Sequence, residues 1–163
     1  MLYKLIVLLH VIAVFGYLLS HWASVAVAFA LKKERNIQKI KALLELSGNS
    51  YPMMFRTFYA SILLGIIATI QAGWWRFGWI WTSVLLLVII FILMIRFGGM
   101  IYGHARMAAG LPYAIRGKHF PAEPPVSEEE LHAILAKGNP VMLTIIGYGG
   151  YALIAWLMIA KPF

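Results

Sequence analysis

The sequence contains no cysteine and no aspartate among its 163 residues, and its six acidic residues are all glutamates. Without cysteine there are no disulfides, no thiolate zinc sites and no cysteine nucleophiles. The six glutamates lie in the connections between long apolar runs, so no carboxylate proton relay or cation site can be built inside a membrane. This argues against an ion-coupled transporter, and the sequence also lacks glycine-rich phosphate loops and catalytic triads.

Charge of either sign is scarce. Only 12% of the residues are charged, 62% are hydrophobic, and the mean hydropathy is +0.81, which is too apolar for a water-soluble domain of this size. The net charge of +8 comes from basic residues that flank the apolar runs and do not form a separate basic domain. The composition therefore predicts an integral membrane protein and no nucleic-acid partner.

Four apolar segments are long enough to cross a bilayer, which takes about 20 helical residues. They cover residues 2–31, 53–72, 79–102 and 141–159. We predict one all-α domain, an integral membrane four-helix bundle that spans residues 1–163. Rows of small and aromatic residues favour close helix packing on the second segment (Ser61, Gly65, Thr69) and the fourth (Thr144, Gly147, Tyr148, Tyr151).

The basic residues predict the orientation. Most Lys and Arg residues lie in or beside the connections 32–52 and 103–140, which are therefore expected in the cytoplasm, with both termini outside. The opposite side has only Lys4, Arg76 and Lys161, together with a tryptophan-rich turn suited to the headgroup boundary. Because basic residues follow the first apolar run, that run is expected to stay uncleaved. We expect a multi-pass protein of a prokaryotic plasma (inner) membrane.

The connections have helical patterns of their own. Ile37, Ile40 and Leu44 recur at helical spacing, and residues 48–50 are expected to end that helix before Pro52 opens the second span. Residues 110–125 should be irregular. The run "SEEELHAILAKG" predicts a short cytoplasmic amphipathic helix that starts at a Ser127 cap, and Asn139 caps the last span.

Two histidines interrupt the first span. His10 and His21 are eleven residues apart, so on a helix they lie within about 20° of one face and about 16 Å apart along the axis. Tyr17 and Ser24 lie on the same face. Polar groups inside a span usually face the bundle interior and are functional candidates. Two imidazoles at this separation on one helix are what a two-haem b-type bundle needs, with each iron held at a different depth.

The second haem ligand is harder to find, because the second and fourth spans contain no histidine. His104, at the inner end of the third span, is the available imidazole, about 10 Å deeper than His21, and Arg96 could pair with a haem propionate. For His10 the choices are a five-coordinate iron or a methionine such as Met158. The alternative is that His10 and His21 are neutral and hydrogen-bonded across the bundle. His119 and His132 are expected to be solvated.

A second constellation suggests copper. Met100, His104 and Met107 fall on one helix face, and thioether with imidazole is a ligand set that Cu(I) prefers. Methionine also fills gaps in apolar bundles, which leaves a purely structural role open.

Several motifs together resemble known families. These are the Leu-His pair of the first span, the basic connection after it, "MMFRTFYASILLGI", the tryptophan-rich turn and "RFGGMIYGHARMAAG". Over about residues 5 to 110 the chain is similar to the small four-helix proteins around the CopD copper-resistance domain, the HemJ-like protoporphyrinogen oxidases and related uncharacterised membrane families. The HemJ resemblance implies a b-type haem on His10 and a counterpart at His104, and the CopD resemblance implies copper passage. His21 has no counterpart in that motif.

Three functional classes follow. The first is a protein that binds haem b or another redox cofactor through His10, His21 and His104. The second is a non-catalytic accessory subunit of a larger respiratory or photosynthetic membrane complex, with no cofactor of its own. The third is a copper-handling protein. The sequence specifies no substrate and no redox partner.

Overall fold

Helices make up most of the computed structural model, which describes residues 1–115 and 117–163. Four helices are long and apolar enough to cross a membrane: Leu2–Lys33, Ile37–Ala72, Gly78–Ala108 and Pro140–Ala160. Each contains one of the four predicted spans, and the four pack together. The predicted helical membrane architecture is therefore confirmed.

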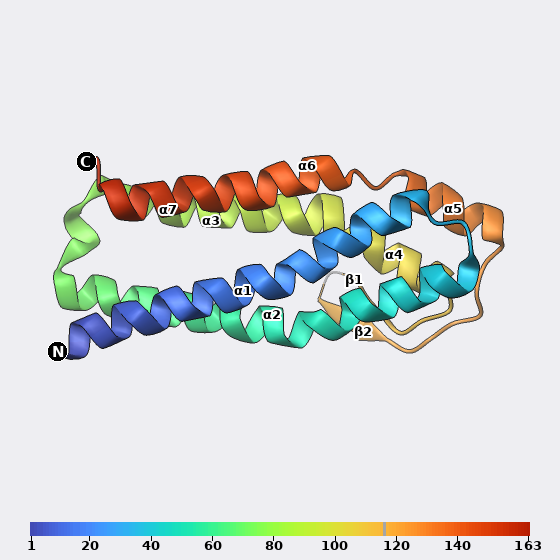
Figure 1. Ribbon diagram of the computed structural model, residues 1–163, viewed down its shortest axis with the longest axis horizontal. Coiled ribbons are helices and arrows are strands. Elements are labelled where there is room, and N and C mark those ends of the chain that lie inside the picture. The colour runs from blue at the N-terminus through green and yellow to red at the C-terminus, as the bar shows by residue number, and fades with distance from the viewer. Residues whose placement is uncertain (116) are drawn as a thin grey trace.

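The four spans are arranged as two pairs (Figure 1). The first pair is an antiparallel hairpin of α1 (Leu2–Lys33) and α2 (Ile37–Ala72). The second pair joins α3 (Gly78–Met94) to α7 (Gly150–Ala160). In this pair α3 continues through the π-helical turn η2 (Ile95–Gly99) into α4 (Met100–Ala108), and α7 is preceded by α6 (Pro140–Thr144) and the π-helical turn η3 (Ile145–Gly149).

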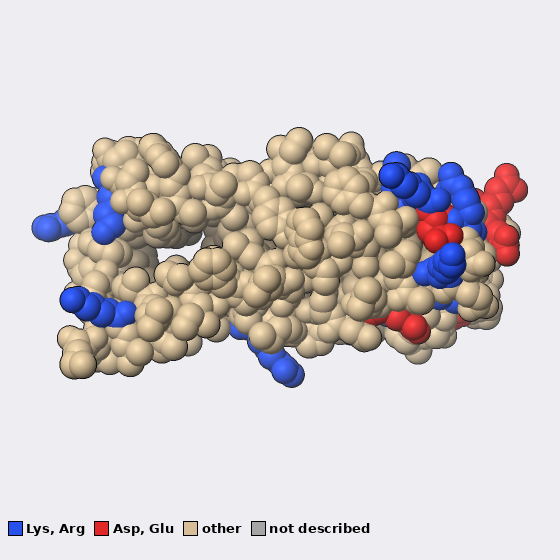
Figure 2. Space-filling view, viewed as in Figure 1, with Lys and Arg blue, Asp and Glu red and all other residues tan. Residues whose placement is uncertain are grey.

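The remaining elements lie at the two ends of the bundle (Figure 1). The 3-10 turn η1 (Trp74–Arg76) crosses from α2 to α3 beside both chain termini, and we call this the terminal end. Strands β1 (Tyr113–Ile115) and β2 (Lys118–Phe120) and helix α5 (Glu128–Ala136) lie at the opposite end, the loop end. Acidic side chains gather at the loop end in Figure 2.

A buried core holds the loop end together. The predicted amphipathic positions are confirmed: Ile40 and Leu44 are almost completely buried, and α5 turns Leu131 and Leu135 inward. The Ser127 hydroxyl accepts a hydrogen bond from the Glu130 amide, as the cap predicted. The full cluster is Val27, Leu31, Ile40, Leu44, Ala105, Ala108, Ala109, Leu111, Leu131 and Leu135.

Two predictions about the connections were wrong. Helix α2 runs without interruption through residues 48–50, and Pro52 lies inside it. Spanning helices tolerate proline within a bundle. Before Pro52, the Arg106 guanidinium lies beside Gly48 and donates a hydrogen bond to the Leu44 carbonyl. The segment 110–125, expected to be irregular, contains the antiparallel pair β1 and β2, in which the rings of Tyr113 and Phe120 stack at 5.0 Å.

The outward surface of the spans is apolar. Large side chains such as Leu19, Ile145 and Ile159 are 72%, 66% and 83% exposed. A surface of this kind is stable in lipid and would be a liability in water. Contact with the lipid bilayer follows from it.

Candidate functional site

The polar stripe predicted on the first span faces the interior of the bundle. Tyr17 is at its centre: its ring stacks on His21 at 5.7 Å and contacts Phe58 of α2 at 5.4 Å and Tyr151 of α7 at 5.1 Å. At the depth of Tyr17, therefore, the two helix pairs are in contact.

His21 is the most deeply buried polar group of the stripe, at 6% exposure. Its Nε2 atom is buried and has no hydrogen-bond partner among the described residues. The atom faces η3, where a Cβ added to Gly147 would lie 3.2 Å from Nε2 and 4.0 Å from the Met94 sulfur. Buried imidazole nitrogens normally have a hydrogen-bond partner, so the unpartnered Nε2 of His21 makes this glycine-lined position near the Met94 thioether a candidate binding site.

Both π-helical turns belong to the second helix pair. Gly147 lies in η3, and η2 begins directly after Met94. Turns of this type are rare and are frequent at functional sites. Here η3 brings the Gly147 backbone against His21 and places Tyr148 at 5.9 Å from the same imidazole. The small-residue row of the fourth span thus packs on the stripe.

His10 faces α2, the other helix of its own pair. Its Nδ1–H donates to the Ser61 carbonyl of α2 at 2.8 Å, and the ring lies over Gly65, whose added Cβ would be 3.1 Å from Cε1. The second small-residue row therefore also packs on a histidine. The Nε2 atom of His10 is neither buried nor hydrogen-bonded to any residue that the structure describes.

An opening separates the two helix pairs near the terminal end. Figure 2 shows the background through the molecule here, and Figure 1 shows η1 crossing from one pair to the other beyond it. We call this the inter-pair opening. The two pairs also touch, since the rings of Tyr17 on α1 and Tyr151 on α7 lie 5.1 Å apart. His10 lies seven residues before Tyr17 and Met158 seven residues after Tyr151, so each is within about 20° of its tyrosine's helix face and about 10 Å nearer the terminal end.

His104 lies apart from this arrangement. The Nδ1–H of His104 donates to the Met100 carbonyl of its own helix at 2.6 Å. The aromatic rings that contact His21 are those of Tyr17 and Tyr148, so His104 does not pair with His21 as the haem hypothesis required. Arg96 is exposed on η2.

An alternative copper site was predicted on the face of Met100, His104 and Met107. Met100 and Met107 are half-buried beside His104 on α4. Within residues 1–115 and 117–163, no three His or acidic side chains converge on a point where one ion could bind. His119 is exposed as expected, but His132 is half-buried, and its Nδ1 atom is a second buried nitrogen with no described partner.

A hydroxyl cluster extends the stripe toward the loop end. Ser24 lies 3.2 Å from Ser47 and 3.3 Å from Ser50, and Ser47 lies 3.5 Å from the Tyr51 hydroxyl. Sequence reasoning found Ser24 but missed the three residues on α2, because they fall where that helix was expected to break. Their spacing of three to four residues was the available signal.

Comparison of the chain with family models, with curated proteins and with solved structures found no match in any of the three.

Proposed function

We propose that this multi-pass membrane protein holds a b-type haem in the inter-pair opening, with His10 as an axial ligand. The observation that carries the proposal is the state of the His10 ring. Nδ1–H is bound to a backbone carbonyl and Nε2 is left free. Metal-ligating histidines usually have this arrangement, because a fixed Nδ1–H sets the tautomer and aims the other nitrogen.

Helix geometry supports the placement. His10 shares its helix face with Tyr17, and that face contacts both α2 and α7 at the depth of the tyrosine. About two helical turns nearer the N-terminus, where His10 lies, the same face of α1 borders the opening. Met158, seven residues after Tyr151 on α7, packs against the cluster of Trp79, Ile80 and Leu157, so His10 is the one ligand that this proposal names. The haem would supply one-electron transfer, while the chain positions it and excludes water.

His21 is a poor haem ligand. Its Nε2 is 3.2 Å from the position that a Cβ on Gly147 would take, and the ring centroids of Tyr17 and Tyr148 lie within 6 Å of its own. A porphyrin has no room there. The likeness to the HemJ-type families points to His10 as the haem ligand as well, but the His104 role that it implies is not part of this proposal.

The same proposal includes the orientation. The loop end contains the connections rich in Lys and Arg, so the positive-inside rule puts it in the cytoplasm and both termini outside a prokaryotic plasma membrane. The inter-pair opening is then in the outer half of the bilayer.

A second candidate function rests on His21. The unpaired Nε2 and the Met94 sulfur both lie within 4.0 Å of the position of a Gly147 Cβ. Imidazole with thioether suits Cu(I), so copper handling would use this pair rather than Met100, His104 and Met107.

The test compares His10→Leu, His21→Leu and His119→Leu in protein purified in a mild detergent. We expect a haem absorption spectrum in the wild type, its loss in His10→Leu, and its retention in the exposed control His119→Leu. His21→Leu should keep the haem. A spectrum that survives in His10→Leu contradicts the proposal, and copper that disappears only in His21→Leu supports the second candidate.

A further inference from the structure

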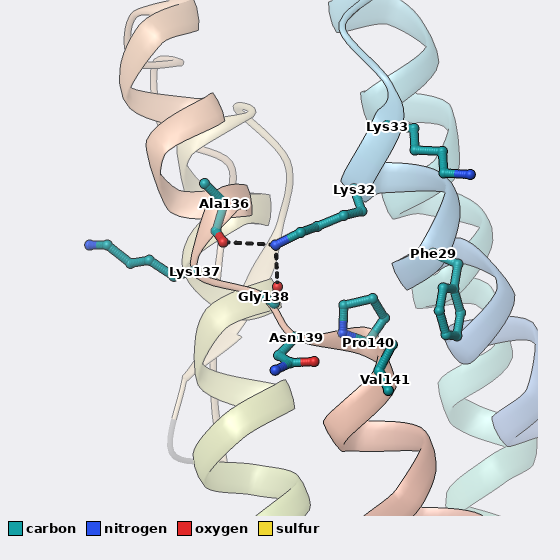
Figure 3. Close-up of a pocket in the computed structure, with 9 residues that line it drawn as sticks. All are labelled: Phe29, Lys32, Lys33, Ala136, Lys137, Gly138, Asn139, Pro140 and Val141. Atoms are coloured by element: carbon teal, nitrogen blue, oxygen red, sulfur yellow. Dashed lines mark hydrogen bonds between the residues drawn. The ribbon is translucent and has the colours of Figure 1, made fainter.

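A pocket of about 450 Å³ opens where the spans reach the loop end. It lies between the end of α1 and the connection from α5 to α6 (Figure 3). Three lysines line it, Lys32 and Lys33 from α1 and Lys137 from the connection, and none of its lining residues is acidic. The residues that line the pocket therefore have a net positive charge, at the end of the spanning helices.

Lys32 is fixed in this wall. Its Nζ atom donates to the Ala136 carbonyl at 3.0 Å and to the Gly138 carbonyl at 2.8 Å, drawn as dashed lines in Figure 3. Two of its three N–H donors are used in this way, which leaves one for a ligand. Lys33 and Lys137 extend to either side of the mouth in the same view, and both are exposed. Their long side chains are free to turn toward an anion.

The opposite wall is apolar. Phe29 of α1 and Val141 of α6 line the pocket and are 41% and 56% exposed. Both belong to spanning helices, so this wall continues onto the surface that faces lipid. A cationic rim beside an apolar, membrane-facing wall complements a molecule with an anionic head and apolar chains.

We propose that this pocket binds the phosphate group of an anionic phospholipid, with its acyl chains against Phe29 and Val141. Basic pockets between spanning helices on the cytoplasmic side recognise such headgroups. A free phosphate ion would contact the lysines but would make no contact with the apolar wall. The lipid proposal rests on the cytoplasmic placement of the loop end proposed above, but it does not depend on the haem, because the pocket is at the other end of the bundle and shares no residue with the proposed haem site.

The test uses the full chain in nanodiscs of mixed phosphatidylcholine and phosphatidylglycerol, followed by native mass spectrometry of the lipid that stays bound. We expect selective retention of phosphatidylglycerol. Each lysine removed at a membrane surface weakens anionic lipid binding about fivefold, so Lys33→Gln with Lys137→Gln should abolish the selectivity. The matched control, Lys41→Gln with Lys118→Gln, removes the same charge from the same end and should keep it.

Two further measurements separate the sources of phosphate. Phe29→Ala should reduce retention of phosphatidylglycerol, and millimolar inorganic phosphate should not displace the lipid from the wild type. Displacement by inorganic phosphate, with no effect of Phe29→Ala, would show a soluble-anion site and overturn the lipid proposal. Equal loss of selectivity in the two double variants would show diffuse charge attraction and overturn it as well.

Discussion

Gly65→Ala tests whether the His10 ring is held where the structure has it. The new Cβ would lie 3.1 Å from Cε1 and 3.3 Å from Nδ1 of His10, closer than side chains normally pack. The ring must move away from α2, and the hydrogen bond to the Ser61 carbonyl at 2.8 Å is strained or lost with it.

The magnitudes decide the sign of the effect. Overpacking a tight contact costs about 1–3 kcal/mol. A lost interhelical hydrogen bond in a membrane adds about 0.6 kcal/mol. Replacing glycine by alanine in a helix returns about 1 kcal/mol. The free energy of unfolding should therefore fall by about 0.6–2.6 kcal/mol.

The assay is unfolding of the purified protein in mixed micelles, followed by circular dichroism. Gly149→Ala is the matched control, since an added Cβ there meets nothing within 4 Å and should leave stability unchanged or slightly higher. The double variant Gly65→Ala with His10→Ala removes the colliding ring, so the cost of the alanine should vanish. Gly65→Ala protein as stable as the wild type, or an equal cost with and without the His10 ring, would refute the packing described.

Two further predictions concern other contacts. Gly150→Ala puts a Cβ 2.5 Å from Cδ1 of Ile90. After the helix gain of about 1 kcal/mol is subtracted from the overpacking cost, the protein should lose up to about 2 kcal/mol in the same unfolding assay, and Ile90→Ala in the same chain should suppress that effect. At the loop end, the hydrogen bond to the Glu123 carboxylate raises the pKa of Tyr113 above its ordinary value. The Tyr113–Glu123 bond should therefore persist through neutral pH and be lost only as the pH rises through that raised pKa, and Glu123→Gln should shift one tyrosine to a lower pKa in an ultraviolet difference titration. An unchanged titration in that variant would contradict the contact.

The sequence predicts the number and nature of the spans well, because length and hydropathy are sufficient for both. Helical periodicity also predicts which face of α1 turns inward. The continuity of α2 through Pro52 could not be predicted in this way, because the local sequence does not reveal that α2 packs along α1. Residues that break a helix in water need not do so where another helix supports the backbone.

The candidate site was predicted only in outline. His10 and His21 were correctly placed on one inward face, but spacing along a helix does not reveal which neighbour each ring meets. In the structure the His10 ring packs on α2, and the His21 ring packs on the turn η3. Met94 was missed because its relevance depends on η3, and π-helical turns have no simple sequence pattern. The His104 ring is bonded like that of His10, with Nδ1–H on a backbone carbonyl, and the two differ in that the carbonyl belongs to the facing helix for His10 and to its own helix for His104.

The most direct test of the central claim is the haem content of the wild-type protein. The chain would be produced with an ample haem supply, purified in a mild detergent, and assayed for haem and iron per polypeptide. The account predicts one b-type haem per chain, released by denaturation because no cysteine is present to bind it covalently. Folded protein that contains neither haem nor iron would contradict the account and favour an accessory subunit without a cofactor.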